Sequence, residues 1–261
     1  NRTQVRGDLL SAGAKLEAIG RLGVGLDNID VEACKARGIA VLPATGANDV
    51  AVAEWAIATI LVLLRGAYFA TDAVAAGTWP RERLMGREIH GKVLGLVGFG
   101  AIARETAIRA RAMGMSIIAA DPFVKADDPA WERIGARSVD LATLLAEADA
   151  VSLHVPLTAE TRDLIDAERL RAMKPDAVIV NAARGGVIDE AALAEALKAG
   201  DIAAAALDVF NVEPLKAGSP LAGCPNLILT PHIAGVTVES NVRVSSVTAA
   251  NVRRVLMGKR T

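Results

Sequence analysis

The chain has 261 residues, of which 52% are hydrophobic and 23% are charged, and its formal net charge at pH 7 is −1. This length and apolar content suffice for a buried core in one large domain or two smaller ones. The balanced charge and the lack of a long basic run argue against nucleic acid or an anionic membrane surface as a partner.

The number and spacing of the cysteines also restrict the class of protein. Cys34 and Cys224 are far apart in the sequence and lack the spacing of metal ligands. We therefore expect no metal site and a reducing compartment, the cytoplasm, although a disulfide stays open. The longest apolar run, residues 55–64, is about half the length of a membrane-spanning helix. No signal peptide is expected.

The first part of the chain predicts a small α/β segment. Apolar stretches at 15–23 and 39–43 are typical of strands, and residues 31–38 between them favour a helix. A long helix is expected over about 50–76. Its portion 53–64 is apolar nearly all round, which indicates burial either in a core or at an interface between domains or subunits.

The remaining sequence alternates apolar runs with amphipathic helical stretches. Six runs lie at 93–97, 116–120, 150–155, 177–183, 202–210 and 227–232. They are continuous rather than alternating, which is typical of parallel strands buried on both faces. Several intervening stretches carry Asp caps or Gly stops. We predict an α/β fold with a doubly wound parallel sheet over about 93–232 and a final helix after residue 235.

A glycine-containing turn follows the first of these runs. The sequence GLVGFGAIARE places Gly98, Gly100 and Ala103 in a strand–turn–helix context. This pattern indicates dinucleotide binding: the first glycine allows the turn, the second admits a pyrophosphate, and the third small residue lets helix and strand pack closely. The N-terminus of the following helix would present unpaired N–H groups to that anion. A plain tight turn is the alternative.

An acidic residue follows the second run. Asp121 lies eighteen residues after Ala103. A carboxylate at this place can accept hydrogen bonds from the ribose hydroxyls of NAD and would repel the 2′-phosphate of NADP. We predict NAD as the cofactor, while a turn-forming role beside Pro122 is the alternative for Asp121.

Further polar or unusual residues follow the later runs, at the sheet edge where ligands bind in this type of fold. In chain order they are His154, Pro156, Ala182, Arg184, Asp208, Glu213 and His232. His154 is expected either to line the cofactor cleft or to be a structural histidine.

Three of these residues suit hydride transfer to a 2-keto acid. Arg184 can bind the substrate carboxylate through two hydrogen bonds. His232 can donate a proton to the developing alkoxide, and Glu213 beside it can fix the tautomer of the imidazole. Each has a structural alternative when taken singly: an ion pair for the arginine, a solvated loop acid for the glutamate and a strand-end position for the histidine.

The motifs NAARGGVIDEAAL, LDVFNVEP and PHIAG resemble the arginine, glutamate and histidine motifs of the D-isomer-specific 2-hydroxyacid dehydrogenases, the family that includes phosphoglycerate dehydrogenase. RLGVGLDNID at 21–30 looks like the family's substrate loop, so the resemblance covers nearly the whole chain. It implies a Rossmann NAD domain at 86–234 and a smaller flavodoxin-like substrate-binding domain at 1–85, completed by 235–261. Because the opening NRTQV looks like a strand from the middle of that domain, the domain is expected to be N-terminally incomplete here.

The resemblance also implies roles for individual residues. The catalytic residues would be Arg184, Glu213 and His232, and the substrate-binding ones Val24, Gly25 and Arg184. The cofactor-binding residues would be Gly98, Gly100, Ala101, Ile102, Ala103, Asp121, His154, Pro156, Ala182, Asp208 and His232. Asp208 in particular would contact the nicotinamide carboxamide, and the long helix would contribute to a homodimer or larger homo-oligomer.

The implied substrate is a D-2-hydroxy acid or its 2-keto acid. GRLGVGLDNID and PATGAN resemble the phosphoglycerate dehydrogenase-like branch, with bacterial sulfolactate dehydrogenases within it. A second anionic group is therefore expected, as in 3-phosphoglycerate or 3-sulfolactate. Candidate cations for that group are Arg2, Arg81, Arg83 and Arg87, which could also form a solvated face.

Two other functions stay open from the sequence. One is a glyoxylate or hydroxypyruvate reductase, and the other is a non-catalytic NAD-sensing module. Formate dehydrogenases of this fold pair their histidine with a glutamine, so Glu213 argues against that reading.

Overall fold

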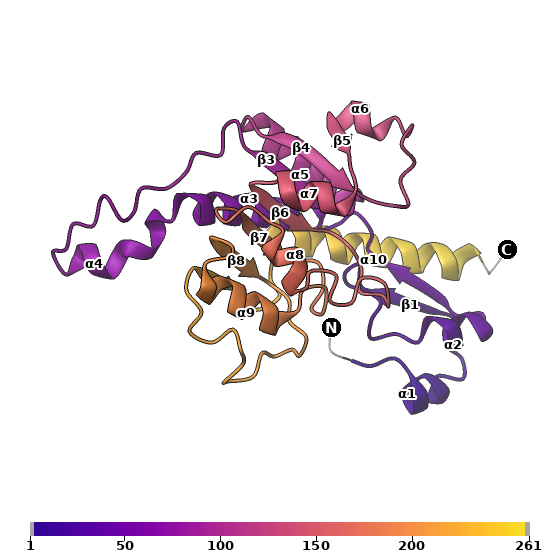
Figure 1. Cartoon of the computed structure of the whole chain (residues 1–261). Helices are drawn as coiled ribbons and strands as arrows, with labels where there is room; N and C mark the ends of the chain where they lie inside the picture. The colour runs from indigo at the N-terminus through magenta and orange to yellow at the C-terminus, as the bar shows by residue number, and fades with distance from the viewer. Residues whose placement is uncertain (1–2, 259–261) are drawn as a thin grey trace. The chain divides into compact units, whose positions relative to one another are not determined.

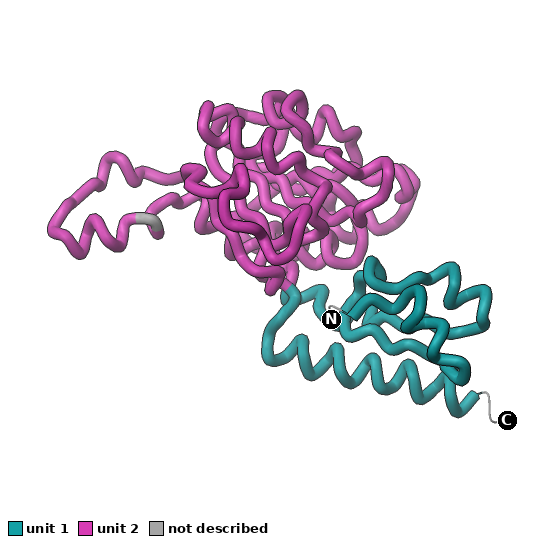
Figure 2. Tube along the Cα trace, turned by 90° about the horizontal axis from the view of Figure 1, so that it is seen from below, with its two compact units in different colours: residues 1–51, 235–261 teal, residues 52–234 magenta. Residues whose placement is uncertain are grey.

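The computed structural model describes residues 3–258, and the chain divides into two compact units (Figure 2). Unit 1 comprises residues 1–51 and 235–261, and unit 2 comprises residues 52–234. The predicted domain boundaries, which assign residues up to 85 to the substrate-binding domain, stay a prediction. Within the described residues, no helix is both long enough and apolar enough to cross a membrane.

Unit 1 contains a short parallel sheet. Its strands β1 (Ala18–Arg21) and β2 (Ala40–Pro43) pair with each other, and α2 (Val31–Ala36) links them. Asp30 begins α2 because its side chain accepts a hydrogen bond from the N–H of Ala33. The strand–helix–strand order expected from the sequence is therefore confirmed. A further short helix, α1 (Gly7–Ala12), precedes the sheet.

The final helix, α10 (Val238–Gly258), packs closely on β1 in the same unit. A Cβ atom at Gly20 would lie 2.6 Å from Cγ2 of Thr248 and 2.8 Å from Cγ2 of Val252. A larger residue at Gly20 would therefore push the helix away from the strand.

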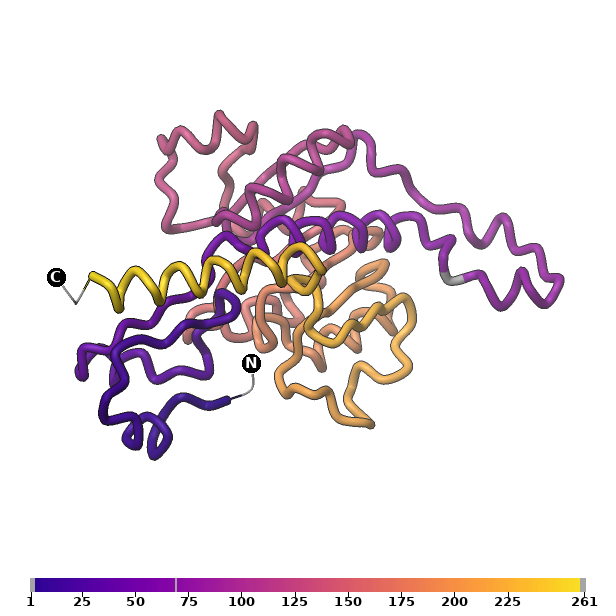
Figure 3. The backbone as a smooth tube through the Cα atoms, turned by 180° about the vertical axis from the view of Figure 1, so that it is seen from behind, coloured from indigo at the N-terminus to yellow at the C-terminus, as the bar shows by residue number. Residues whose placement is uncertain are grey.

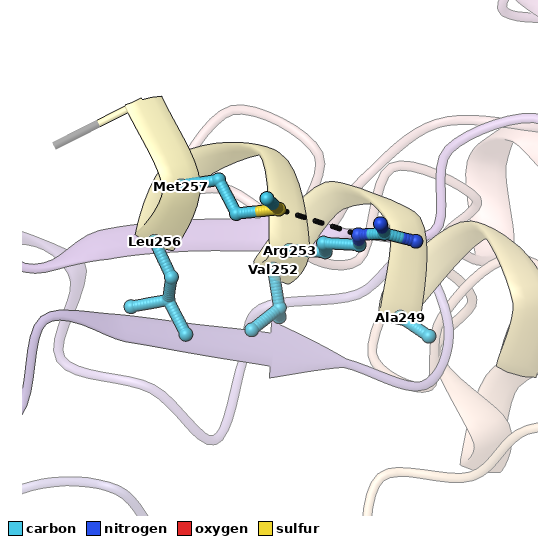
Figure 4. Close-up of a pocket in the computed structure, with 5 residues that line it drawn as sticks. All are labelled: Ala249, Val252, Arg253, Leu256 and Met257. Carbon is cyan, nitrogen blue, oxygen red and sulfur yellow. Dashed lines mark hydrogen bonds between the residues drawn. The ribbon is translucent and has the colours of Figure 1, made fainter. Parts of the chain in front are cut away.

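A shallow depression lies beside α10 (Figure 4). Its lining residues are Ala249, Val252, Arg253, Leu256 and Met257. Val252 and Leu256 point toward the strands, while Nε of Arg253 lies 3.3 Å from Sδ of Met257. Among the described residues, no carboxylate or histidine lines this depression.

Unit 2 is built on a parallel sheet of seven strands in the order β5-β4-β3-β6-β7-β8-β9. The strands are β3 (Val93–Val97), β4 (Ser116–Ala120), β5 (Ala136–Ser138), β6 (Ala150–Leu153), β7 (Val178–Asn181), β8 (Ala204–Leu207) and β9 (Leu227–Leu229). The doubly wound parallel sheet is thus confirmed. The sequence predicts six strands and misses β5, which has three residues at the sheet edge and no apolar run.

Helices cover both faces of this sheet (Figure 1). One face carries α3 (Asp49–Arg65), α5 (Ala101–Ala112) and α6 (Ala130–Ile134), and the other carries α7 (Leu141–Glu147), α8 (Ala167–Arg171) and α9 (Glu190–Ala199). Leu96 and Val97 are adjacent in β3 but belong to different hydrophobic clusters. This follows because successive strand side chains point to opposite faces.

The long predicted helix ends earlier than expected. α3 stops at Arg65 because Gly66 adopts a left-handed conformation, with φ of 60°. Short helical turns follow, η1 (Ala67–Ala70) and α4 (Thr71–Ala75). Ile60 of α3 is fully buried in the cluster that contains Leu96, so the apolar part of this helix is core.

Residues 66–88, here called the arm, extend from the body of unit 2 (Figures 2 and 3). The arm closes at its base, where the N–H of Arg87 donates to the carbonyl of Leu64 over 2.8 Å. Gly86 lies so close to Arg65 that a Cβ atom would fall 2.1 Å from the Arg65 carbonyl oxygen. The arm is thus a loop pinned at both ends.

Candidate active site

The glycine turn joins β3 to α5 and has the geometry that dinucleotide binding requires. Gly98 has φ of 91°, and a Cβ atom there would lie 2.8 Å from the carbonyl oxygen of His154. Glycine is therefore needed for the turn itself. Ala103 is completely buried, as the third small position of the pattern requires.

Gly100, by contrast, faces open space. A Cβ atom there would meet nothing within 4 Å, and no side chain caps the start of α5. The first N–H groups of α5, at Ala101 and Ile102, are the ones that lack partners within a helix. This open cradle at a helix N-terminus fits the pyrophosphate of a dinucleotide, and a side chain at Gly100 would fill it.

Asp121 is held against this turn by two hydrogen bonds. Its Oδ2 accepts from the N–H of Phe99 over 2.8 Å, and its Oδ1 accepts from the N–H of Phe123 over 2.9 Å. Each carboxylate oxygen keeps a second lone pair for another donor, such as a ribose hydroxyl. Phe99 is itself fixed, because it is fully buried and stacks on Trp131 with ring centroids 4.1 Å apart.

His154 lies at the end of β6, beside the glycine turn. Its N–H donates to the carbonyl of Val97 over 2.8 Å, and its Nε2 lies 3.0 Å from Oγ of Ser152. Desolvation lowers the pKa of His154 to about 4, so the ring is neutral near pH 7. In the next loop, the carbonyl of Pro156 accepts a hydrogen bond from Oγ1 of Thr161.

The structure brings His232 and Glu213 into direct contact. Nδ1 of His232 lies 2.8 Å from Oε2 of Glu213, and Oε1 of Glu213 accepts from the N–H of Phe210 over 3.1 Å. The side chain of His232 is 53% exposed. Because Nδ1 is bound to the glutamate, Nε2 is the ring nitrogen through which this histidine can exchange a proton with a ligand.

Asp208 binds groups on both sides of His232: the side-chain hydroxyl of Thr230 before it and two backbone N–H groups after it. Asp208 is 1% exposed, and its carboxylate accepts from Oγ1 of Thr230 and from the N–H groups of Ile233 and Ala234, over 2.5, 2.8 and 2.8 Å. His232 has φ of 57°, an unusual value for a residue other than glycine. The buried carboxylate therefore stabilises the strained turn that presents the imidazole, a role that sequence reasoning missed. Contact of Asp208 with the nicotinamide carboxamide stays a prediction.

The loop that carries Arg184 follows β7 and lies directly against the loop that carries Glu213. A Cβ atom at Gly185 would fall 1.9 Å from the carbonyl oxygen of Phe210, so only glycine allows this approach. Ala182, in the same loop, is half-buried. Arg184, Glu213 and His232 thus come from neighbouring loops at the carboxyl edge of one sheet.

The predicted substrate-loop residues Val24 and Gly25 lie in unit 1, in the loop after β1. Arg21 braces this loop, because its Nε donates to the carbonyl of Gly25 and its Nη1 to the carbonyl of Leu22, over 2.8 and 2.6 Å. Gly23 between them has φ of 140°. Residues other than glycine rarely adopt a φ of this value.

The candidate cations for a second anionic group differ in their surroundings. Arg2 lies outside the described residues, and Arg81 and Arg83 are exposed on the arm. Arg87 forms ion pairs with Asp149 and Asp176 over 2.8 and 3.1 Å. Asp149 also accepts from the N–H of the first residue of β3, so this group marks the amino edge of the sheet, away from the catalytic candidates. Among residues 3–258, no cluster of three or more His, Cys, Asp or Glu could hold a metal ion.

Comparison with known proteins agrees with this geometry. Residues 57–234 match the family described as D-isomer specific 2-hydroxyacid dehydrogenase, NAD binding domain. The chain is 58% identical over 256 residues to the (S)-sulfolactate dehydrogenase of Chromohalobacter salexigens, covering 98% of this chain and 82% of that protein. It is 43% identical over 258 residues to the D-3-phosphoglycerate dehydrogenase of Archaeoglobus fulgidus, covering 99% of this chain and 49% of that protein.

A solved structure leads to the same family. The D-lactate dehydrogenase of Aquifex aeolicus, complexed with NAD and lactic acid, superposes with a TM-score of 0.88 at 33% identity, covering 98% of this chain and 80% of that one. The chain therefore belongs to the D-isomer-specific 2-hydroxyacid dehydrogenases, NAD-dependent oxidoreductases that act on a CH–OH group, and residues 57–234 match the family's NAD-binding domain.

Proposed function

We propose that this chain interconverts a 2-hydroxy acid and its 2-keto acid, with Arg184, Glu213 and His232 as the catalytic residues. The observation that carries the proposal is the 2.8 Å contact between Nδ1 of His232 and Oε2 of Glu213, next to the loop of Arg184. A histidine held by a carboxylate and facing solvent through its other nitrogen is arranged for proton transfer.

The residues divide the work as follows. Bound NADH would supply the hydride, held by the glycine turn at 98–103 and by Asp121. Arg184 would hold the substrate carboxylate through paired N–H donors, which orients the keto carbon. His232 would donate the proton on Nε2 to the carbonyl oxygen, while Glu213 keeps the ring oriented through Nδ1. In the oxidative direction, Nε2 of His232 would take the hydroxyl proton.

The remaining predicted residues have supporting roles in this proposal. The backbone N–H groups of Val24 and Gly25 would share the substrate carboxylate with Arg184. His154, Pro156 and Ala182 would border the cofactor, with the neutral ring of His154 adding no charge near it.

We further propose a substrate with a second anionic group, 3-sulfolactate in preference to 3-phosphoglycerate. The support is the higher identity to the sulfolactate dehydrogenase, 58% against 43%. Arg87 is not favoured for that group, because it is already paired with two aspartates at the amino edge of the sheet. The free thiols Cys34 and Cys224 support a cytoplasmic location.

The arm supports a homodimer. Its exposed apolar side chains are Tyr68, Val74, Trp79 and Met85, which are 68, 45, 73 and 83% exposed. Gathered on one projecting segment, they form the kind of surface that a second protein chain covers.

NADH oxidation with sulfopyruvate, phosphohydroxypyruvate, hydroxypyruvate and glyoxylate tests the proposal. We expect turnover with sulfopyruvate to exceed that with the others.

His232→Ala should lower kcat by at least about a hundredfold, because proton transfer is lost, while NADH affinity changes little. Glu213→Gln should lower kcat by about tenfold or more, since a neutral amide can accept a hydrogen bond from Nδ1 but does not stabilise the positive charge of the imidazolium. Full activity of His232→Ala would disprove the catalytic assignment, and a preference for NADPH would contradict the role of Asp121.

A further inference from the structure

Asn181, the last residue of β7, bridges two backbone groups of the Arg184 loop. It is 2% exposed, so its amide is shielded from water. Its Oδ1 accepts from the N–H of Ala183, and its Nδ2 donates to the carbonyl of Arg184, both over 2.9 Å. Because one partner is a donor and the other an acceptor, these two bonds fix the orientation of the amide.

The same residue ties this loop to the next strand. The backbone carbonyl of Asn181 accepts from the N–H of Asp208 over 2.9 Å, at the point where β8 leads into the Glu213 loop. Gly185, one residue after Arg184, rests against Phe210, whose N–H in turn binds Glu213. The turn at 182–185 is therefore braced from within by Asn181 and from outside by Phe210.

We propose that Asn181 is a positioning residue that sets the place of Arg184 and thereby the affinity for the substrate carboxylate. This inference rests on the proposed function, in which Arg184 binds that carboxylate. Without the amide, the N–H of Ala183 and the carbonyl of Arg184 lose these two hydrogen bonds in a half-buried turn, so we expect the turn to rearrange. Only a side chain with one donor and one acceptor at this length bridges both groups.

The test compares Asn181→Ala and Asn181→Asp with the wild-type enzyme. Aspartate keeps the size of asparagine and the acceptor for Ala183 but has no donor for the carbonyl of Arg184. For both variants we expect KM for the 2-keto acid that the wild type reduces fastest to rise by about ten- to a hundredfold, the cost of a misplaced binding group. The Kd for NADH should rise much less than KM, because Ala182 is the one proposed cofactor contact in this turn, whereas the glycine turn at 98–103 and Asp121 lie outside it.

Asn226→Gly is the matched control. Nδ2 of Asn226 donates to the carbonyl of Ala203 over 3.1 Å, just before β9, at the amino edge of the same sheet. Glycine accepts the φ of 52° found there, so this variant removes a solvent-exposed amide-to-carbonyl hydrogen bond of the same sheet without added backbone strain. Its KM should equal that of the wild type.

A double-mutant cycle separates positioning from general stabilisation. If Asn181 acts through Arg184, Asn181→Ala should lower kcat/KM in the wild type but have no effect in an Arg184→Ala background. An equal loss in both backgrounds would overturn the inference, as would Asn181 variants whose KM matches that of the control. If the alanine variant does not fold, Asn181→Asp decides by the same measurements. A wild type that reduces no 2-keto acid overturns the proposed function as well, whereas an active wild type with unaffected variants overturns only this inference.

Discussion

Two histidines at the carboxyl edge of the unit 2 sheet have different surroundings and should behave differently. His232 faces solvent and has one ring nitrogen on Glu213. His154 is desolvated, with Nε2 near the hydroxyl of Ser152 and no acidic partner described for it. The first arrangement suits proton exchange with a ligand, and the second keeps a ring neutral.

The pH dependence of the free energy of unfolding should show the lowered pKa of His154. Its pKa in the folded protein is about 4, below the ordinary value of 6.5, so between these values the unfolded chain binds more protons. The stability contributed by the neutral ring is complete above pH 6.5 and is lost as the pH falls toward 4, by roughly 3 kcal/mol. In urea unfolding at pH 7.5 and 4.5, His154→Asn should lose less stability than the wild type over this interval. Equal losses would contradict the prediction.

At the scale of elements, the two glycines in the turn from β3 to α5 are needed for different reasons. Gly98 is required by the fold, because a side chain would strike the carbonyl of His154 and φ is 91°. Gly100 has an ordinary φ of −72° and open space around its Cβ position. The fold does not explain a glycine there, but a bound pyrophosphate would.

Replacing each glycine by alanine should distinguish an effect on folding stability from an effect on cofactor binding. Gly98→Ala should lower the free energy of unfolding by about 1–3 kcal/mol through backbone strain. Gly100→Ala should lower the stability of the ligand-free protein by no more than about 1 kcal/mol, the cost of a poorer N-cap for α5. It should nevertheless raise the Kd for NADH by about tenfold or more, because the methyl group occupies the cradle. Thermal unfolding and NADH fluorescence titration measure the two effects. Unchanged NADH affinity in Gly100→Ala would place the pyrophosphate elsewhere.

At the scale of the whole molecule, the residues proposed for cofactor binding and proton transfer lie in unit 2, whereas the predicted substrate loop lies in unit 1. The arm belongs to unit 2 and extends from its body (Figure 3). Its apolar side chains Tyr68, Val74, Trp79 and Met85 are exposed. An assembly that covers the arm would remove this apolar surface from water.

If the arm forms the proposed dimer interface, replacing its apolar side chains should weaken the dimer. In Trp79→Ser combined with Met85→Ser, two large apolar contacts are lost, and light scattering at micromolar concentration should show a shift from dimer to monomer. Phe123→Ser is the control, because Phe123 is 94% exposed but lies outside the arm. A variant that stays dimeric, or a wild type that is monomeric, would rule out the arm as the interface.

The sequence by itself determined the elements whose cause is local. Buried parallel strands appear as continuous apolar runs because both faces are covered, and Asp140 and Asp189 mark the starts of α7 and α9 because their side chains accept the first N–H groups of each helix. The glycine turn and the order of polar residues after the strands could also be predicted, because they too follow from the local sequence. The structure also bears out the family resemblance.

Only the tertiary structure decided how these residues meet. The edge strand β5 has no apolar run, and the end of α3 at Gly66 depends on one left-handed residue. The contact of Glu213 with His232, the three hydrogen bonds of Asp208 and the bridge made by Asn181 join groups on loops and strand ends. Such contacts are set by the register and packing of the whole sheet rather than by local propensity, so sequence spacing could indicate the edge where these residues gather but not the bonds that hold them there.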